Sequence, residues 1–294
     1  MDRRAFVLSL AAAGAAHAQT KRRMLIDADT ANEIDDLFAI VRALREPSFE
    51  IAALSSAQWH NRISPENTVE LSQRMNEDLL RLAARQDIPA PMGAEMIMGK
   101  PWGGDEPRDS PAARMIIAEA MATRTGRLPV VSIGATTNVA SALKMKPEIR
   151  DRISCYLMGG HYEASTGVWN KDEFNVRNDL NAFNYLLNLD GLDLHIMPAT
   201  TCRHLVFERE AAMKRLNAGG PLAGYLAARW IAHAPESTKW IMWDLALIEA
   251  IAKPELAEES KCKTPPENQQ REVWVYTSID ARAMEADFWR AAGW

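Results

Sequence analysis

Short β-rich runs alternate with longer amphipathic segments along this chain, and that alternation most constrains its fold. Strand-like runs occur at residues 24–27, 50–56, 128–133, 153–158, 192–198 and 272–276. Apolar residues at helical spacing predict helices at 36–44, 66–82 and 112–121. This order predicts an α/β fold with an open, mostly parallel sheet and helices on both faces. In such sheets ligands bind at the carboxyl ends of the strands, so we expect functional residues directly after strands.

Composition and charge exclude several classes of protein. The chain has 294 residues, of which 47% are hydrophobic, enough for one large core. Its formal charge is −5 and its basic residues form no long run, which argues against nucleic acid as a partner. The three cysteines, Cys155, Cys202 and Cys262, are far apart and odd in number, so they suggest neither a disulfide framework nor a zinc site.

The N-terminus resembles an export signal. Arg3 and Arg4 precede an apolar stretch, and a small-x-small cleavage pattern ends at Ala18. The stretch has about 12 residues, whereas a helix that spans a membrane needs about 20. Paired arginines are typical of the twin-arginine route. We therefore expect residues 1–18 to be removed and residues 19–294 to form a single periplasmic domain without a membrane anchor.

A dense group of acidic residues follows the first predicted strand. The segment LIDADTANEIDDLFAI, residues 25–40, holds five carboxylates between an apolar strand and an apolar helix, namely Asp27, Asp29, Glu33, Asp35 and Asp36. Helix capping and the helix dipole explain one or two of them. Five carboxylates at one strand end would repel one another unless a cation neutralised them, and a hard divalent ion prefers oxygen ligands. The segment therefore predicts a metal site, with capping alone as the alternative.

Several motifs in this chain resemble those of the nucleoside hydrolases, in particular the inosine-uridine-preferring type. The family consists of calcium-dependent enzymes that cleave the N-glycosidic bond of ribonucleosides. Its D-x-D motif and the Asp-Asp pair that opens a helix match the acidic segment. Further motifs follow in the expected order: VVSIGATTNVASAL at 130–143, LMGGHY at 157–162, DEFNVRNDLNA at 172–182 and MWDLALIEA at 242–250. The resemblance covers residues 24–252.

The resemblance implies a calcium site and a catalytic base. Asp29, Asp36 and Asp244 would coordinate Ca²⁺ together with the main-chain carbonyl of Ile133. Ribose hydroxyls and a water would complete the shell, and Asp29 would take the proton of that water as it attacks the anomeric carbon. Such an arrangement is physically reasonable, because a water next to a cation loses its proton more easily.

The resemblance also implies how the nucleoside is held. Asp35 would bind the ribose 2′-hydroxyl and Asp244 the 3′-hydroxyl, while Glu173 and Asn175 would bind the 3′ and 5′ side of the sugar. Two further substrate-binding candidates are Met158 and Asn170, the latter as the counterpart of an asparagine usual in the family. A homodimer or homotetramer is implied as well.

The chain departs from the family pattern at two places. The loop between Asp29 and Asp35 has five residues instead of the common three, so Asn32 or Glu33 could reach the site. Trp243 stands before Asp244, where many members have a histidine that protonates the leaving base. The purine-preferring branch uses tryptophans stacked on the base, so Trp243 is interpreted as a stacking group or else as a core residue.

Other aromatic and polar residues near predicted strand ends are weaker candidates. Trp59 and Trp102 could complete a base sandwich or pack in the ordinary way, and His60 and Asn61 could face the ribose. His161, directly after a glycine pair, is a candidate acid.

Two alternative functions remain at this stage. An exported, non-catalytic protein could keep the calcium and ribose pocket without turnover. A haloacid-dehalogenase-like phosphatase would use Asp27 as nucleophile and Asp29 as acid, because MLIDADT fits a strand followed by D-x-D-x-T. That fold also needs a later lysine and a late acidic pair, but here the pair Asp35-Asp36 follows after only six residues and no later predicted strand ends in two carboxylates.

Overall fold

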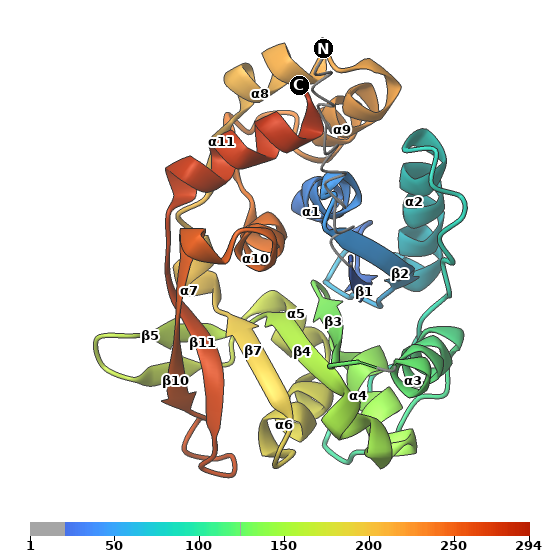
Figure 1. The fold of residues 1–294 in the computed structure, drawn as a ribbon, viewed down its shortest axis with the longest axis vertical. Coiled ribbons are helices and arrows are strands. Elements are labelled where there is room, and N and C mark those ends of the chain that lie inside the picture. The colour runs from blue at the N-terminus through green and yellow to red at the C-terminus, as the bar shows by residue number, and fades with distance from the viewer. Residues whose placement is uncertain (1–20, 124) are drawn as a thin grey trace, which may run out of the picture.

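A seven-stranded sheet forms the centre of the molecule (Figure 1). The computed structural model describes residues 21–123 and 125–294, so the predicted export signal lies outside the described residues. The strand order is β10-β11-β7-β4-β3-β1-β2, and the neighbours are parallel except for β10 and β11. The strands are β1 (Arg22–Ala28), β2 (Phe49–Ser56), β3 (Leu128–Ser132), β4 (Ile153–Met158), β7 (Asp193–Met197), β10 (Ala257–Lys263) and β11 (Glu272–Ile279).

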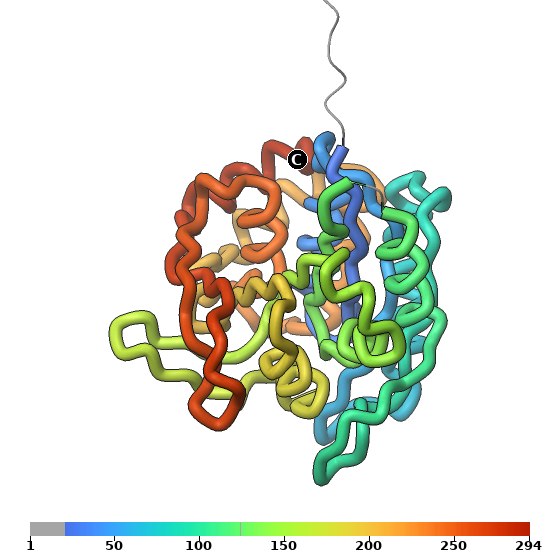
Figure 2. The backbone as a smooth tube through the Cα atoms, turned by 60° about the horizontal axis from the view of Figure 1, so that its bottom comes forward, coloured from blue at the N-terminus to red at the C-terminus, as the bar shows by residue number. Residues whose placement is uncertain are grey.

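Helices and two small hairpins surround this sheet. The helices are α1 (Asp35–Arg45), α2 (Thr68–Leu82), α3 (Pro111–Ala122), α4 (Thr137–Met145), α5 (Phe174–Asn178), α6 (Leu180–Asn188), α7 (Ala199–Cys202), α8 (Arg209–Leu216), α9 (Gly220–His233), α10 (Trp243–Ala252) and α11 (Ala281–Ala292). The hairpins pair β5 (His161–Glu163) with β6 (Val168–Asn170) and β8 (Val206–Glu208) with β9 (Lys239–Ile241). Figure 2 shows the β5–β6 hairpin projecting from the body of the molecule.

Both faces of the sheet are covered, as the apolar pattern of its strands requires. Successive side chains of β1 point to opposite faces, so Met24 and Ile26 join one buried cluster and Leu25 joins another. The first cluster takes its helical residues mainly from α1, α9, α10 and α11, and the second from α3, α4 and α6. The prediction of an open, mostly parallel sheet with helices on both faces is confirmed.

The edge strand β10 was not predicted. Its sequence, AEESKCK, is largely polar, and most of its residues are exposed or only half-buried. It pairs antiparallel with β11, and none of the strands in residues 21–123 and 125–294 pairs with its other side. A strand with one free edge and a solvated face shows little of the apolar pattern by which buried parallel strands are recognised.

The chain reverses its direction of winding between β1 and β3. From β1 it passes through α1 to β2 at the edge of the sheet, and it later returns to place β3 on the other side of β1. Such a switch point leaves a crevice at the carboxyl ends of the two strands. Asp29 follows β1 and Ile133 follows β3 at this edge. Within the described residues, no helix combines the length and apolar character needed to cross a bilayer.

Candidate active site

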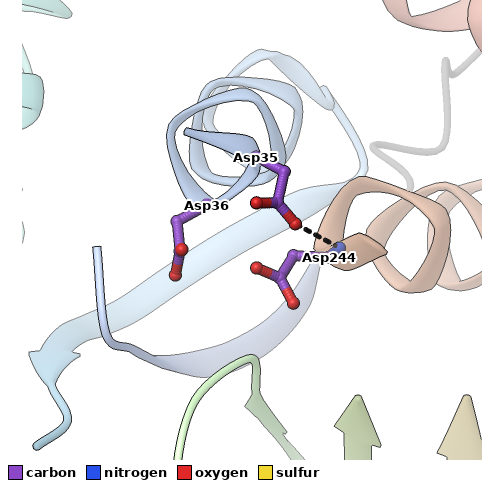
Figure 3. Close-up of side chains that lie close together, drawn as sticks. All are labelled: Asp35, Asp36 and Asp244. Atoms are coloured by element: carbon purple, nitrogen blue, oxygen red, sulfur yellow. Dashed lines mark hydrogen bonds between the residues drawn. The ribbon is translucent and has the colours of Figure 1, made fainter. Parts of the chain in front are cut away.

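Three carboxylates meet where the N-termini of α1 and α10 approach each other (Figure 3). Asp35 and Asp36 open α1, and Asp244 lies in the first turn of α10. One oxygen of each carboxylate lies within 4.8 Å of the other two. The main-chain N–H of Asp244 donates a 3.1 Å hydrogen bond to Oδ2 of Asp35, which joins the two helix ends. Residues 209 positions apart in sequence thus share one site.

Capping does not explain this cluster. The N-cap position of α1 is Ile34, and no side chain makes a capping hydrogen bond there. The positive end of a helix dipole does favour carboxylates in the first turn, but only by about 0.3 to 1 kcal/mol each. Burying an ionised carboxylate without a partner costs several kcal/mol. A further positive charge is therefore required if Asp35, Asp36 and Asp244 are to be ionised together.

The same carboxylates have unsatisfied oxygens. Asp29, Asp35, Asp36 and Asp244 are all buried. Oδ2 of Asp29 and the Oδ1 atoms of Asp35 and Asp36 have no hydrogen-bond partner in the part of the chain that the structure describes. Burial raises the pKa of Asp29, Asp36 and Asp244 well above the usual range, and repulsion among the carboxylates raises it further. Burial also raises the pKa of Asp35, to about 6. An oxygen-only set of buried, unpartnered carboxylates fits a hard divalent cation such as Ca²⁺.

These carboxylates line one wall of a cavity of about 240 Å³. Its volume is below the roughly 300 to 1,000 Å³ of typical small-molecule sites, which favours a compact ligand. The predicted site residues that line it are Asp29, Asp35, Asp36, Met158, Glu173, Asn175, Trp243 and Asp244. Asn32, Glu33 and His161 line it as well. Asn32 and Glu33 of the longer first loop thus both reach the cavity, and burial raises the pKa of Glu33 to about 8.

Glu173 is held rigidly at the start of α5. As the N-cap residue, it accepts hydrogen bonds from the main-chain N–H groups of Asn175 and Val176, both at 3.1 Å. A third N–H, that of Gly160, lies 3.2 Å from its Oε2. Burial raises the pKa of this carboxyl group, whereas the three N–H donors oppose the rise. Glu173 thus combines an ordinary capping role with a position in the cavity wall.

Asn175 connects the cavity to two strand ends. Its Nδ2 donates to the main-chain oxygens of Met158, at 3.3 Å, and Ile133, at 3.4 Å. The carbonyl of Ile133 therefore points toward the cavity wall that Asn175 forms. The role of the Ile133 carbonyl as a metal ligand remains a prediction.

Some sequence candidates lie outside the cavity. Asn170 is exposed on β6, and its Oδ1 accepts a 2.8 Å hydrogen bond from the main-chain N–H of Asp172. Its role in substrate binding therefore has no support in the cavity lining and stays a prediction. Trp102 is 82% exposed. Trp59, His60 and Asn61 are absent from the lining as well, and so is Ile133, the predicted main-chain metal ligand.

The sequence reasoning missed four residues of the lining, namely Asp172, Phe174, Arg177 and Ala199. Asp172 and Phe174 flank Glu173 within the DEFN motif, so the motif itself contained the signal. Arg177 follows Phe174 by one turn of α5 and makes an ion pair with Asp172, with Nη1 and Oδ1 2.7 Å apart. Ala199 begins α7 and had no distinguishing sequence feature.

The expectation that all five carboxylates of the first segment converge is wrong for Asp27. Asp27 is buried within β1 and does not line the cavity. Its Oδ1 accepts hydrogen bonds from Oγ of Ser55, at 2.5 Å, and Nδ2 of Asn138, at 3.0 Å. Burial raises its pKa to about 6, and these two hydrogen bonds oppose the rise. Asp27 is a structural group that ties β1 to β2 and α4.

The fold of this chain is similar to that of solved nucleoside hydrolase structures. A plant nucleoside hydrolase superposes with a TM-score of 0.74 at 17% identity, covering 92% of this chain and 99% of the other. A purine-preferring ribonucleoside hydrolase from Gardnerella vaginalis superposes with a TM-score of 0.70 at 20% identity, covering 92% of this chain and 98% of the other.

The sequence comparison gives the family. The sequence model of the inosine-uridine preferring nucleoside hydrolases matches residues 24–287, so the chain belongs to this family and is an N-glycosyl hydrolase. The pyrimidine-specific ribonucleoside hydrolase RihA of Salmonella paratyphi A is 28% identical over 225 residues, which are 69% of this chain and 68% of that protein. The phosphatase alternative is therefore wrong, in agreement with the position of Asp27 away from the cavity.

Proposed function

We propose that this protein hydrolyses the N-glycosidic bond of ribonucleosides to free base and ribose, with Ca²⁺ as its cofactor. One observation carries the proposal: buried, unpartnered carboxylate oxygens converge at the switch point of a nucleoside hydrolase fold. A neutral ligand would leave these charges uncompensated. A divalent cation together with a hydroxyl-rich sugar would satisfy them.

Four groups of this chain would hold the ion, namely the carboxylates of Asp29, Asp36 and Asp244 and the carbonyl of Ile133. When bound, Ca²⁺ would polarise a water and the ribose hydroxyls and make loss of the water's proton easier. Asp35 lies close enough to be a further ligand. However, its Oδ2 already accepts the Asp244 N–H, which leaves Oδ1 for the ribose 2′-hydroxyl.

Asp29 would act as the general base. Burial and neighbouring carboxylates raise its pKa, and a bound cation would hold it ionised, so that it could accept the proton of an attacking water. The water oxygen bonds to the anomeric carbon as the bond from this carbon to the base nitrogen breaks, and the electron pair leaves with the base. Positive charge develops on the ribose meanwhile, and the surrounding carboxylates stabilise it. Glu173 and Asn175, which also line the cavity, would bind the sugar hydroxyls.

Trp243 would contact the base. It is the first residue of α10, directly before Asp244, and it lines the cavity. Its indole can therefore stack on a base whose ribose is held by the neighbouring carboxylates. Stacking on an aromatic ring stabilises any base, but the larger purine ring system gains more.

We further propose that the mature chain begins after Ala18, folds as a single domain, is exported by the twin-arginine route to the periplasm and forms a homo-oligomer. Arg3, Arg4 and the small-x-small pattern support export. The proposal of a homo-oligomer rests on the resemblance to the family.

Release of ribose tests the function. The mature protein is incubated with inosine, adenosine, guanosine, uridine and cytidine, with Ca²⁺, after chelation and after Ca²⁺ is restored. We expect ribose release with Ca²⁺, loss on chelation and recovery on restoration. Asp29→Asn should abolish release while the circular dichroism spectrum is unchanged. If no nucleoside is cleaved while Ca²⁺ still raises thermal stability, the site binds its ligand without turnover and the proposal fails.

A further inference from the structure

The leaving base requires a proton that the residues assigned so far do not supply. When the glycosidic bond breaks, the electron pair stays on the base, and a purine or pyrimidine anion is a poor leaving group unless it is protonated. Asp29 accepts a proton in the proposed reaction and so cannot donate one in the same step. Trp243 stands where many family members have a histidine, and an indole N–H is too weak an acid to replace it. This inference rests on the proposed function and deepens it.

His161 is the histidine of the described chain that lines the cavity. It begins β5, directly after Gly160, whose N–H is bound by Glu173. The other histidines of the described residues, His60, His195, His204 and His233, do not line this cavity. His161 therefore shares one chamber with the general base Asp29 and the stacking candidate Trp243.

The hydrogen bonding of His161 determines which ring nitrogen can exchange a proton. Its Nε2 lies 3.2 Å from the main-chain oxygen of Asp172. A carbonyl oxygen can only accept, so Nε2 must carry the hydrogen of this bond. The neutral ring then has its lone pair on Nδ1, and protonation of the ring occurs there. We propose that His161 is the acid that protonates the leaving base, through Nδ1.

Three charged residues of α5 and the segment before it line the cavity together with His161. The carboxylate of Glu173 would attract a positively charged imidazole electrostatically. Arg177 would oppose this attraction, but Arg177 is paired with Asp172 at 2.7 Å, so that pair is nearly neutral. Glu33 lies in the lining of the same cavity and adds a titratable acidic group.

The elements packed against β5 add no competing charge at His161. These elements are β6 and α7. The residue paired with His161 on β6 is the neutral Asn170. On α7, Ala199 lines the cavity, and the buried thiol of Cys202 stays neutral because burial raises its pKa well above the usual value.

The proposed step balances in atoms and charge. The bond between the anomeric carbon and the base nitrogen breaks, and its electron pair goes to the base. A ring nitrogen of the base receives the proton from Nδ1 of His161, while Asp29 receives the proton of the attacking water. The base leaves neutral, and the imidazole then regains the proton that Asp29 releases, directly or through solvent.

A pair of substrates tests this assignment. Inosine needs a proton on its leaving group, whereas p-nitrophenyl β-D-ribofuranoside releases a stable phenolate without one. For His161→Gln we expect kcat on inosine to fall by about 10² to 10⁴, the usual contribution of a general acid. On the p-nitrophenyl riboside we expect kcat to stay within about threefold. The matched control is His204→Gln, because His204 is exposed and outside the cavity, and it should leave both rates unchanged.

The pH profile gives a second readout. The wild type should lose kcat on inosine as rising pH removes the proton from the acid, and His161→Gln should lack this alkaline decline. An equal loss on both substrates would show that His161 holds the ribose or the fold, and an unchanged rate on inosine would show that another group donates the proton. Either result overturns the assignment. Failure of the wild type on both substrates would instead contradict the proposed function itself.

Discussion

The main-chain N–H of Asp244 donates to Oδ2 of Asp35 over 3.1 Å, and this bond joins the first turns of α10 and α1. The same two helices are joined again deeper in the core, where Nε of Arg42 lies 2.8 Å from Oε1 of Glu249. Arg42 is fully buried and also pairs with Asp287 of α11, at 2.6 Å. Figure 1 shows α1 and α10 packed next to each other. The carboxylate cluster therefore sits at the end of a helix pair held at two points.

Removing the buried guanidinium should destabilise the protein more than removing one of its partners. Arg42 pairs with three carboxylates, those of Glu46, Glu249 and Asp287. Arg42→Met leaves all three buried without their shared cation and should lower the free energy of unfolding by about 3 to 5 kcal/mol. Glu249→Gln removes one of several negative charges and should cost less. Urea unfolding of both variants measures the difference, and equal losses would contradict this view of the cluster.

The same cluster predicts a dependence of stability on pH. Burial raises the pKa of Glu249 from its ordinary 4.5 to about 7, although Arg42 opposes the rise. Between these values the folded state binds more protons than the unfolded state. The contribution of Glu249 therefore decreases as pH rises from about 4.5 to about 7, by at most about 3 kcal/mol.

Glu249→Gln isolates this contribution, because glutamine does not titrate. Unfolding free energies at pH 5 and pH 8 should differ less in the variant than in the wild type. A variant whose stability falls with pH as steeply as that of the wild type would assign the dependence to other carboxyl groups.

Calcium should stabilise the folded protein through the cluster at the helix ends. Binding to the folded state alone contributes about 2.7 kcal/mol when the free ion is at 100 times its Kd. For a chain of this size we expect Tm to rise by roughly 5 °C or more. Asp36→Asn should abolish most of that rise, whereas Asp151→Asn, a change at an exposed carboxylate, should retain it. Differential scanning fluorimetry with and without Ca²⁺ measures the rise in Tm of each variant. A rise in Asp36→Asn as large as in the wild type would show that Asp36 is not a ligand of the ion.

Local sequence patterns predicted the parts of this site that lie close together in the chain. Asp29, Asp35 and Asp36 follow one apolar strand and open one helix, so their proximity follows from the topology of a parallel sheet. Asp244 could be added only through family resemblance, because no local pattern indicates that α10 packs on α1. That Asn32 or Glu33 reaches the site was anticipated from the length of their loop relative to the family pattern.

Other features depend on tertiary contacts that no local pattern contains. Asp27 looked like its acidic neighbours, but it lies within β1, where Ser55 and Asn138, the latter 111 positions away, hold it in the core by hydrogen bonds. Arg177 reaches the cavity because the short helix α5 turns it toward Asp172. The polar edge strand β10 is defined only by its pairing with β11.

Gly134 should be required for the placement of the catalytic base. A Cβ atom at this position would lie 2.9 Å from Oδ1 of Asp29 and 3.0 Å from its Cβ and Cγ atoms, closer than ordinary contacts. Gly134→Ala must therefore displace Asp29, and misplacement of a catalytic group by about 1 Å can cost about 10² in rate. We expect kcat for ribose release to fall at least about tenfold.

The matched control for this change is Gly224→Ala. Gly224 lies within α9, and a Cβ atom there would meet no atom within 4 Å. Alanine should raise stability by up to about 1 kcal/mol at this helical position and leave kcat unchanged. Equal activity of the two variants would show that the loop after β3 shifts to make room for the added methyl group and leaves Asp29 in place.

Trp243 should distinguish purines from pyrimidines. Its indole lines the cavity beside Asp244, so truncation removes a stacking surface without removing a carboxylate. Trp243→Ala should lower kcat/KM by roughly tenfold or more for inosine and by less for uridine, because stacking contributes about 1 to 3 kcal/mol per base and the purine ring is larger. Trp243→Phe keeps an aromatic face and should recover much of the inosine activity. Equal losses for both nucleosides would mean that Trp243 only supports the position of Asp244, and base preference would then have to come from other lining residues, such as Phe174 and Arg177.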